Sequence, residues 1–282
     1  MKKQFHILFF ILFLSVLRVV AQRTPTSSEL GLFIGASYYT GDLCPMGHFN
    51  QFTKPAGGIV YRYNFNPRLA FRGNFLVGTI AAYDEFSNVT AQQQRNLSFK
   101  STIGELSAQI EFNFLQYEIG DGETPFSPYI FLGLAGFKFN PKAKLDDKWI
   151  ALQPLGTEGQ GLADGASKKL YKLTQISIPF GVGIKINLAK RLGASLEWGM
   201  RKTFTDYLDD VSSRYYDPAK LVANRGALSA ILSDRSLGKD PSKSNVGRLR
   251  GNPTNNDWYS FAGVVLTVKL NGKRERCPGV GN

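Results

Sequence analysis

Polar and apolar residues alternate with a period of two along much of the chain, which is the pattern of a β-strand with two unlike faces. The clearest run spans 175–186, where one face holds Ile176, Ile178, Phe180, Val182, Ile184 and Ile186. The same alternation recurs in segments 30–39, 57–65, 69–80, 105–114, 129–139, 192–201 and 259–270. These eight segments predict an all-β chain of eight antiparallel strands.

The two faces of these strands differ in size and polarity. One face holds Phe, Trp, Ile and Leu at nearly every step, whereas the other holds Gly, Ser, Asn and charged residues. Eight strands enclose a space that is just wide enough for side chains, so the small and polar face fits the inside. A soluble barrel that buries the apolar face is the alternative. We therefore predict an eight-stranded up-and-down transmembrane β-barrel whose apolar face meets lipid.

Charged residues of both signs fall on the face that we assign to the lumen. They are Arg62, Arg72, Lys138, Lys185 and Arg201 on one side and Glu105, Glu111 and Glu197 on the other. Buried charges are tolerated only when they are paired. The pattern therefore predicts a network of salt bridges that plugs the barrel.

The connections between the predicted strands alternate between short and long. The long ones span about 40–54, 84–97, 141–174 and 204–257, and the short ones 64–67, 118–128 and 188–191. Outer-membrane barrels have short periplasmic turns and long outer loops, and an even number of strands places both termini in the periplasm. Tyrosines near strand ends are expected in the interfacial girdles: Tyr61, Tyr63, Tyr83, Tyr117, Tyr129 and Tyr259.

The first 21 residues have the features of an export signal. Lys2 and Lys3 precede an apolar run over 7–20, which ends in the small-residue site Val19-Val20-Ala21. The alternative is a membrane anchor, but the run is short for a membrane span. We expect cleavage after Ala21, which leaves a barrel of residues 22–282 in the outer membrane.

Composition argues against catalysis. The 282 residues include 2 histidines and 2 cysteines, at a formal net charge of +12. Outer-membrane proteases, acyltransferases and deacylases generally need a histidine beside Ser or Asp. After cleavage of the signal, His48, in the first long loop, would be the one histidine that remains. No Cys/His cluster has metal-binding spacing. We therefore predict a protein that is not an enzyme and needs no cofactor.

The longest loop, 204–257, holds two further candidates. Asp206, Asp209 and Asp210 are weak candidates for Ca²⁺ ligands, because carboxylates are the oxygen ligands that Ca²⁺ prefers. The alternative is an acidic turn held by its own hydrogen bonds. A basic run over 220–250 is a candidate contact for lipopolysaccharide phosphates; the simpler interpretation is a solvated, partly disordered loop. Its cations are Arg225, Arg235, Lys239, Lys243, Arg248 and Arg250.

The two cysteines lie on opposite sides of the membrane in this topology. Cys44 falls in the first outer loop, whereas Cys277 falls in the periplasmic tail 271–282. The apolar band of such barrels is about 25 Å tall, and a disulfide needs Cα atoms within about 7 Å. The two cysteines therefore cannot pair with each other, which leaves an intermolecular bond or an idle thiol.

Several segments resemble a family of Bacteroidota outer-membrane barrels that includes PorG, a component of the type IX secretion and gliding machinery. They are Glu29-Leu30-Gly31, Tyr38-Tyr39-Thr40-Gly41-Asp42-Leu43, Tyr61-Arg62-Tyr63-Asn64, 204–212 and Cys277-Pro278. The resemblance implies a non-enzymatic membrane component that contacts a periplasmic ring of PorK and PorN type.

If that ring lies under the membrane, the tail is the segment that would reach it. We predict that Cys277 forms an intermolecular disulfide, or at least a docking contact, with a PorK-like ring lipoprotein, and that Arg274 and Arg276 favour the reactive thiolate. Outer-membrane lipid or lipopolysaccharide is the other expected partner, and nucleic acid is not one. The alternative function is a surface barrel for adhesion or envelope integrity, which acts through its long loops. A channel is less well supported, because eight strands leave no aqueous pore.

Overall fold

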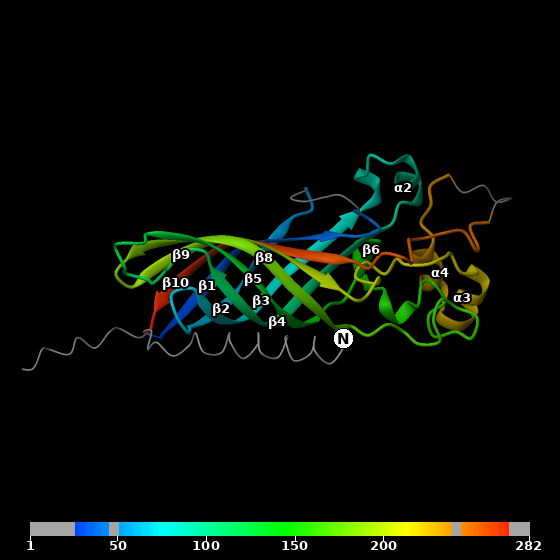
Figure 1. Cartoon of the computed structure of the whole chain (residues 1–282). Helices are drawn as coiled ribbons and strands as arrows, with labels where there is room; N and C mark the ends of the chain where they lie inside the picture. Colours follow the sequence, from blue (N-terminus) through cyan, green and yellow to red (C-terminus); the bar gives the residue numbers. More distant parts are fainter. Residues whose placement is uncertain (1–25, 45–50, 239–243, 271–282) are drawn as a thin grey trace, which may run out of the picture.

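Eight long antiparallel strands form a closed barrel in the computed structural model, which describes residues 26–44, 51–238 and 244–270. The strands are β1 (Ser27–Thr40), β2 (Lys54–Asn64), β3 (Leu69–Tyr83), β4 (Ser98–Asn113), β5 (Phe126–Lys138), β8 (Thr174–Ala189), β9 (Leu192–Thr203) and β10 (Trp258–Lys269). Each strand pairs with the next one along the barrel, and β1 pairs with β10, which closes the sheet. The prediction of an eight-stranded antiparallel barrel is confirmed (Figure 1).

The outside of the barrel is apolar. Large side chains at alternate strand positions point outward, and many are about half exposed or more, such as Leu106, Leu134 and Leu196. A continuous surface of exposed Leu, Ile and Phe around a closed barrel is the surface that lipid covers in outer-membrane barrels. The chain is therefore an outer-membrane β-barrel, and the alternative of a soluble barrel with a buried apolar face is wrong.

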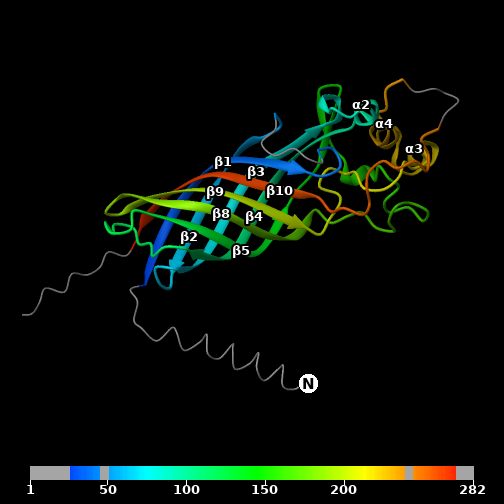
Figure 2. The ribbon, with the colours of Figure 1, turned by 45° about the horizontal axis from the view of Figure 1, so that its top comes forward.

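The two ends of the barrel differ in how their strands are joined. At one end the connections are 65–68, 114–125 and 190–191, and the first of them is set by Asn66, whose side chain accepts hydrogen bonds from the backbone N–H groups of Arg68 and Leu69. Pro67 follows Asn66 and fixes the turn. Because Glu29 pairs with Lys269, β1 begins and β10 ends at this same end (Figure 2).

The long connections fold into an ordered cap at the other end. Its helices are η2 (Asp84–Phe86), α2 (Thr90–Arg95), η3 (Gln153–Leu155), α3 (Pro218–Arg225) and α4 (Ala227–Ser233). Helix α3 begins where the Asp217 side chain accepts a hydrogen bond from the Ala219 N–H and Pro218 occupies the first turn. Within the described part of the chain, every helix is too short or too polar to span a membrane.

The loop 204–257 is more ordered than its sequence suggests. Arg250 is 2% exposed and Arg225 and Arg235 are half-buried, so the interpretation of this run as a solvated loop is wrong for these three arginines. Arg248 is exposed, as expected. Alternation along the chain carries no information about such side chains, because their partners lie on other loops.

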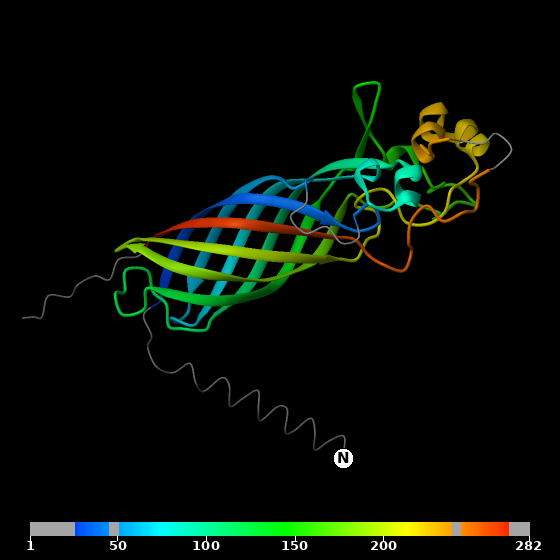
Figure 3. The same ribbon diagram turned by 90° about the horizontal axis from the view of Figure 1, so that it is seen from above.

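A two-stranded hairpin leaves the barrel at the cap end. It consists of β6 (Lys142–Leu145) and β7 (Lys148–Ala151), and β6 joins the barrel through the pairing of Lys142 with Lys100 of β4. Figure 3 shows this hairpin, in green, standing out to one side of the barrel. These residues fall inside the segment 141–174, which the sequence predicts as a long loop.

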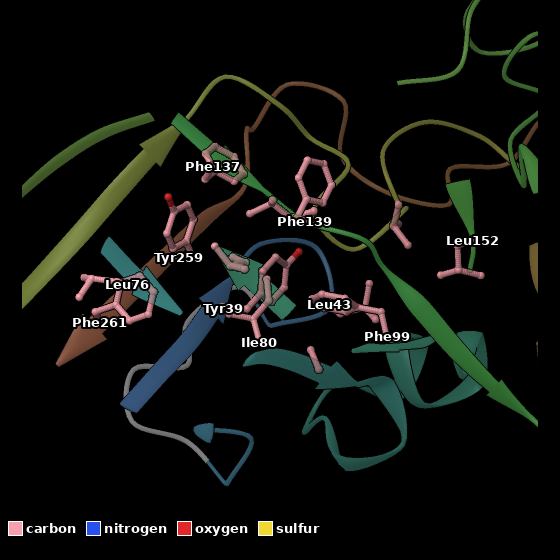
Figure 4. Packing of buried hydrophobic residues seen from close by; sticks show 14 of the residues in the cluster. Tyr39, Leu43, Leu76, Ile80, Phe99, Phe137, Phe139, Leu152, Tyr259 and Phe261 are labelled. Atoms are coloured by element: carbon pink, nitrogen blue, oxygen red, sulfur yellow. The ribbon is translucent and has the colours of Figure 1, made fainter. Parts of the chain in front are cut away.

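The apolar core lies between the barrel lumen and the cap. Aromatic rings from four strands, β1, β4, β5 and β10, meet there; Tyr39 packs edge-on against Phe99, with ring centroids 4.9 Å apart, and Phe137 lies 5.1 Å from Tyr259. Leu43 and Leu152 come into the same cluster from the loops (Figure 4), and Leu208 of the longest loop belongs to it as well. Burial of this cluster joins the loops to the barrel end, since apolar area removed from water stabilises by about 25 cal/mol per Å².

Three predicted girdle tyrosines and one predicted lumen lysine are placed differently by the structure. Tyr117, Tyr129 and Tyr259 are at most 4% exposed and point inward, because their hydroxyl groups or rings contact lumen charges. Tyr61 is exposed on the outer surface, as expected of a girdle residue. Lys138 faces outward, because position 138 continues the outward series of Leu132 and Leu134 on β5.

Several sequence predictions fall outside the described residues. They are the signal peptide 1–21, His48, Lys239, Lys243 and the tail residues Arg274, Arg276 and Cys277. Cys44 is described, and it lies half-buried in the first long loop.

Candidate functional site

The lumen of the barrel holds a compact set of buried charges. Apart from Lys138, which faces outward, the charged residues predicted for it are all at most 4% exposed: Arg62, Arg72, Glu105, Glu111, Lys185, Glu197 and Arg201. Glu29 of β1, which the sequence analysis did not assign to the lumen, joins them through an ion pair of 3.1 Å with Arg62. Each side chain lies on an inward position of its strand, so the closure of the barrel brings them together.

Glu111 of β4 is at the centre of the larger group. Its carboxylate lies 3.0 Å from Nε of Arg62 and 3.6 Å from Nη1 of Arg72, and it also contacts the Lys185 ammonium. Three cations around one carboxylate hold β2, β3, β4 and β8 together near the end of the barrel that has the short turns. Removing one partner of a buried pair typically costs about 3–5 kcal/mol, because the remaining charge is left without compensation.

Glu197 of β9 closes the same group on the other side of the lumen. Both terminal nitrogens of Arg72 donate to its two oxygens at 2.7 Å, a bidentate geometry. The Tyr129 hydroxyl donates to the same carboxylate at 2.7 Å. Gly183 makes room for the Tyr129 ring, since a Cβ at position 183 would lie 2.5 Å from the ring.

A smaller group lies nearer the cap. Arg201 donates from Nε to Glu105 at 3.0 Å, and the Tyr259 hydroxyl donates to the same carboxylate at 2.9 Å. The Arg201 guanidinium also lies 4.7 Å from the centre of the Phe261 ring. The two groups together therefore balance four cations (Arg62, Arg72, Lys185, Arg201) against four acids (Glu29, Glu105, Glu111, Glu197). Side chains of this size fill an eight-stranded barrel, which leaves it plugged.

The cap is held together by arginine side chains that reach across loops. Arg95 of α2 pairs with Asp84 at 2.7 and 2.8 Å and also donates to the backbone oxygens of Asp42 and Arg250. It therefore links the first, second and fourth long connections. These contacts fix loops that are far apart in sequence.

Arg250 makes the matching link to the third long connection. Its Nη1 donates to Glu158 at 3.0 Å, and Glu158 also accepts hydrogen bonds from the backbone N–H groups of Ser212 and Ser213. The guanidinium lies 3.8 Å from the Asp210 carboxylate. Burial, with a smaller contribution from the charge of Glu158, raises the pKa of Asp210 to about 6, although Arg250 and the hydrogen bonds from Thr157 and Tyr171 act to lower it.

Tyr39 joins the barrel end to two buried aspartates. Its hydroxyl lies 2.6 Å from Oδ2 of Asp209 and 2.8 Å from Oδ1 of Asp257. A hydroxyl carries one proton, so it can donate to only one of the two carboxyl groups. The other contact is a hydrogen bond only if that second carboxyl is protonated and donates to the tyrosine oxygen. Burial raises the pKa of both aspartates well above the ordinary range, which agrees with a proton held in this group.

Asp206 is another buried acid of the cap whose pKa is raised. It is 9% exposed, and neither carboxylate oxygen has a hydrogen-bond partner in the described residues. Burial raises its pKa to about 7, with added repulsion from Asp42 and Glu158, and the nearby Ser212 hydroxyl opposes this only in part.

The three aspartates proposed as metal ligands do not converge on one point. Asp209 accepts from Tyr39, whereas Asp210 accepts from Thr157 and Tyr171. Across residues 26–44, 51–238 and 244–270, no group of three or more His, Cys, Asp or Glu side chains is placed to hold a metal ion. The acidic turn is the interpretation that fits, with part of its hydrogen bonding supplied by Tyr39 and other loops.

Sequence reasoning missed the residues that tie the cap together. Asp84, Arg95, Glu158 and Asp257 lie in the long connections between the barrel strands, where no period of two marks them. The only signal was the number of charged residues in connections that were expected to be solvated.

The chain belongs to the family described as "Domain of unknown function (DUF6089)", whose model matches residues 2–228. No curated protein matches the sequence. Among solved structures, the attachment invasion locus protein Ail of Yersinia pestis has a TM-score of 0.41 at 10% identity and covers 88% of this chain and 100% of that one. Neisserial surface protein A has a TM-score of 0.41 at 9% identity (87% and 99% covered), and OprG of Pseudomonas aeruginosa 0.36 at 7% (86% and 97%).

Proposed function

We propose that this member of the DUF6089 family is a non-enzymatic outer-membrane component of the type IX protein secretion system that docks a periplasmic PorK/PorN-type ring to the outer membrane. The secretion assignment comes from the sequence resemblance to the PorG family. The observation that carries the docking role is the plugged lumen. A barrel whose interior is filled by four cations and four acids does not conduct cargo, so its contribution is that of a fixed membrane anchor.

The position of the tail supports this role. Strand β10 ends beside the start of β1, at the end with short turns, and residues 271–282 follow directly. Lys269 is held there by an ion pair of 2.7 Å with Glu118. With the short turns in the periplasm, the tail begins at the inner surface of the outer membrane, within reach of a ring lipoprotein.

The decisive experiment is a crosslink between the tail and the ring in intact cells. Whole cells are analysed on a non-reducing gel, followed by identification of the partner by mass spectrometry. We expect a high-mass band that Cys277→Ser abolishes and that the matched variant Cys44→Ser leaves in place. The variant Arg274→Ala/Arg276→Ala should weaken the band, because the arginines favour the reactive thiolate.

Two results would contradict the docking role. One is wild-type secretion of type IX cargo in a strain that lacks the tail, with the truncated barrel still inserted in the outer membrane. The other is a Cys277-dependent band whose partner is not a ring component.

The ordered cap favours one alternative function, a surface barrel for adhesion or envelope integrity. Four long connections are fixed to one another by Arg95 and Arg250, and such order is expected of a surface that presents a binding face. Replacing 217–232, which removes most of α3 and α4, by a Gly/Ser linker separates the two functions. Loss of adhesion or envelope integrity with intact secretion would favour the surface role.

A further inference from the structure

A row of lysines lies on the outer surface of the barrel at the cap end. Lys138 of β5, Lys142 and Lys144 of β6 and Lys100 of β4 are all exposed, and Trp149 of β7 lies beside them. We name these five residues the lysine face. The Lys100 ammonium lies 5.3 Å from the centre of the Trp149 ring, so the two side chains share one side of the sheet.

The strand register explains why these side chains point the same way. Lys138 pairs opposite Gly104 of β4 and Lys142 opposite Lys100, so β6 continues the register of β5 along the same neighbour. Lys144 lies two residues beyond Lys142 and pairs opposite Trp149. Residues that are paired across antiparallel strands, or that lie two apart along one strand, project from the same face.

The lysine face begins where the apolar surface of the barrel ends. On β5 the outward series reads Ile130, Leu132, Leu134, Gly136 and then Lys138, and on β4 it reads Leu106, Gly104, Thr102 and then Lys100. The change from apolar to cationic residues marks the boundary between hydrocarbon and headgroups. A tryptophan among lysines is the composition that barrels place at this depth.

The charges of this region are only partly neutralised within the protein. The hairpin tip carries the exposed acids Asp146 and Asp147, and Asp147 contacts Lys144. Lys100, Lys138 and Lys142 form no ion pair in the described residues. An excess of exposed positive charge remains just outside the apolar surface, turned to the side where the neighbouring lipid lies.

We propose that the lysine face binds the phosphate groups of outer-leaflet lipid, with Lys100, Lys142 and Lys144 as the main contacts and Trp149 at the headgroup level. This inference rests on one part of the proposed function, the orientation with the long loops outside the cell. It is independent of the docked ring. It assigns the lipid contact to the β4–β6–β7 surface rather than to the run 220–250, whose Arg250 is used inside the cap.

The test uses the full-length mature barrel purified in a neutral detergent. Binding of diphosphoryl lipid A is measured by titration, with dephosphorylated lipid A and inorganic phosphate as separate probes. Each lysine near an anionic lipid surface contributes roughly fivefold to binding. We therefore expect Lys100→Gln/Lys142→Gln/Lys144→Gln to weaken lipid A binding about 100-fold, and removal of the lipid phosphates to weaken wild-type binding to a similar extent.

The matched control is Lys168→Gln/Lys169→Gln/Lys220→Gln, which removes the same charge from exposed cap lysines outside the lysine face. It should change binding less than threefold. Equal losses in the two variants, or no loss in either, would overturn the proposal, as would saturation of the face by inorganic phosphate alone. A shift in gel mobility on boiling verifies that each variant is a folded barrel.

A second measurement separates failure of this proposal from failure of the orientation. In a background with Cys44→Ser and Cys277→Ser, the hairpin variant Lys148→Cys is treated in intact cells with a membrane-impermeant maleimide. Labelling shows that the hairpin is outside the cell, and then the binding data alone decide the proposal. Labelling only after lysis contradicts the orientation and overturns the outer-leaflet assignment, whereas loss of ring docking alone affects neither readout.

Discussion

The lumen and the cap both bury charged side chains, but they balance the charges in opposite ways. In the lumen, four cations face four acids, and Arg72 meets Glu197 in a bidentate pair. In the cap, the described residues include six buried acids (Asp84, Glu158, Asp206, Asp209, Asp210, Asp257), but Arg250 is the one buried cation among them, and Arg95, Arg225 and Arg235 are half-buried.

The two regions differ in what compensates their buried acidic side chains. A strand position in the lumen can be matched by a cation on a neighbouring strand at fixed register, so pairs form. In the cap, surplus acids are compensated by protons instead, as the shared contacts of Tyr39 and the raised pKa of Asp206 indicate. The lumen should therefore resist changes of pH near neutrality, whereas the cap should respond to them.

The largest effect is expected from breaking the balance of the lumen. Glu111→Ala leaves Arg62, Lys185 and Arg72 without their shared carboxylate, and we expect a loss of about 3–5 kcal/mol in the free energy of unfolding of the barrel. Urea unfolding in detergent micelles, followed by tryptophan fluorescence, measures it.

The control for this experiment is Asp147→Ala, which breaks the exposed pair with Lys144 on the hairpin. Exposed pairs contribute little, so the unfolding midpoint should not move. If Glu111→Ala were as mild as the control, the lumen network would not be what holds the inner barrel together.

A smaller effect is expected from the acid surplus of the cap. The pKa of Asp206 is raised from 3.8 to about 7, because burial disfavours the carboxylate. A group with a raised folded-state pKa contributes its stability in full below its unfolded pKa and loses it as the pH rises through the folded value. The cap should therefore become less stable as the pH rises from about 4 to about 7. Above pH 7, Asp206 should cause little further change in its stability.

The substitution Asp206→Asn tests that window. The amide stays neutral, so the variant cap should be more stable than wild type at pH 8, by about 1–2 kcal/mol after allowance for solvent near the cap surface, and equal to it at pH 4. Amide hydrogen exchange of 204–215 at both values measures this. Asp217→Asn, at the start of α3, is a control in the same loop. A wild-type cap that gains stability from pH 4 to pH 8 through Asp206 would refute the idea.

How much of each region the sequence reveals follows from the same difference. Alternation with a period of two identifies inward positions on a strand, so Arg62, Glu111 and Arg201 could be assigned to the lumen without knowing their partners. The assignment of Lys138 to the lumen is wrong, because β5 is apolar on both faces and alternation therefore does not show which of its positions point inward.

The cap has no comparable pattern. Arg95 and Glu158 have partners that are tens of residues away, on other loops, and no spacing along the chain announces those contacts. The family resemblance implies a function but assigns no role to individual residues of the cap. The acidic residues of 204–212 are visible in the sequence, but there they suggest metal ligands and not carboxyl groups that hold protons.

The smallest effect on stability is expected from Asp257→Asn, because an amide can make the same hydrogen bonds as a protonated carboxyl group. If the shared group holds a proton, a protonated Asp257 donates to the Tyr39 oxygen while its other oxygen accepts from the Leu208 N–H at 2.9 Å. Asp257→Asn reproduces both hydrogen bonds, because the amide nitrogen donates and the amide oxygen accepts. The cap should then keep its stability at pH 5 within about 0.5 kcal/mol, whereas Asp257→Ala leaves buried groups unsatisfied and should cost about 1–3 kcal/mol. Hydrogen exchange of the cap amides compares the two variants. An asparagine as damaging as the alanine would show that both aspartates are charged, and the contrast between a lumen balanced by ion pairs and a cap balanced by protons would fail at its central residue.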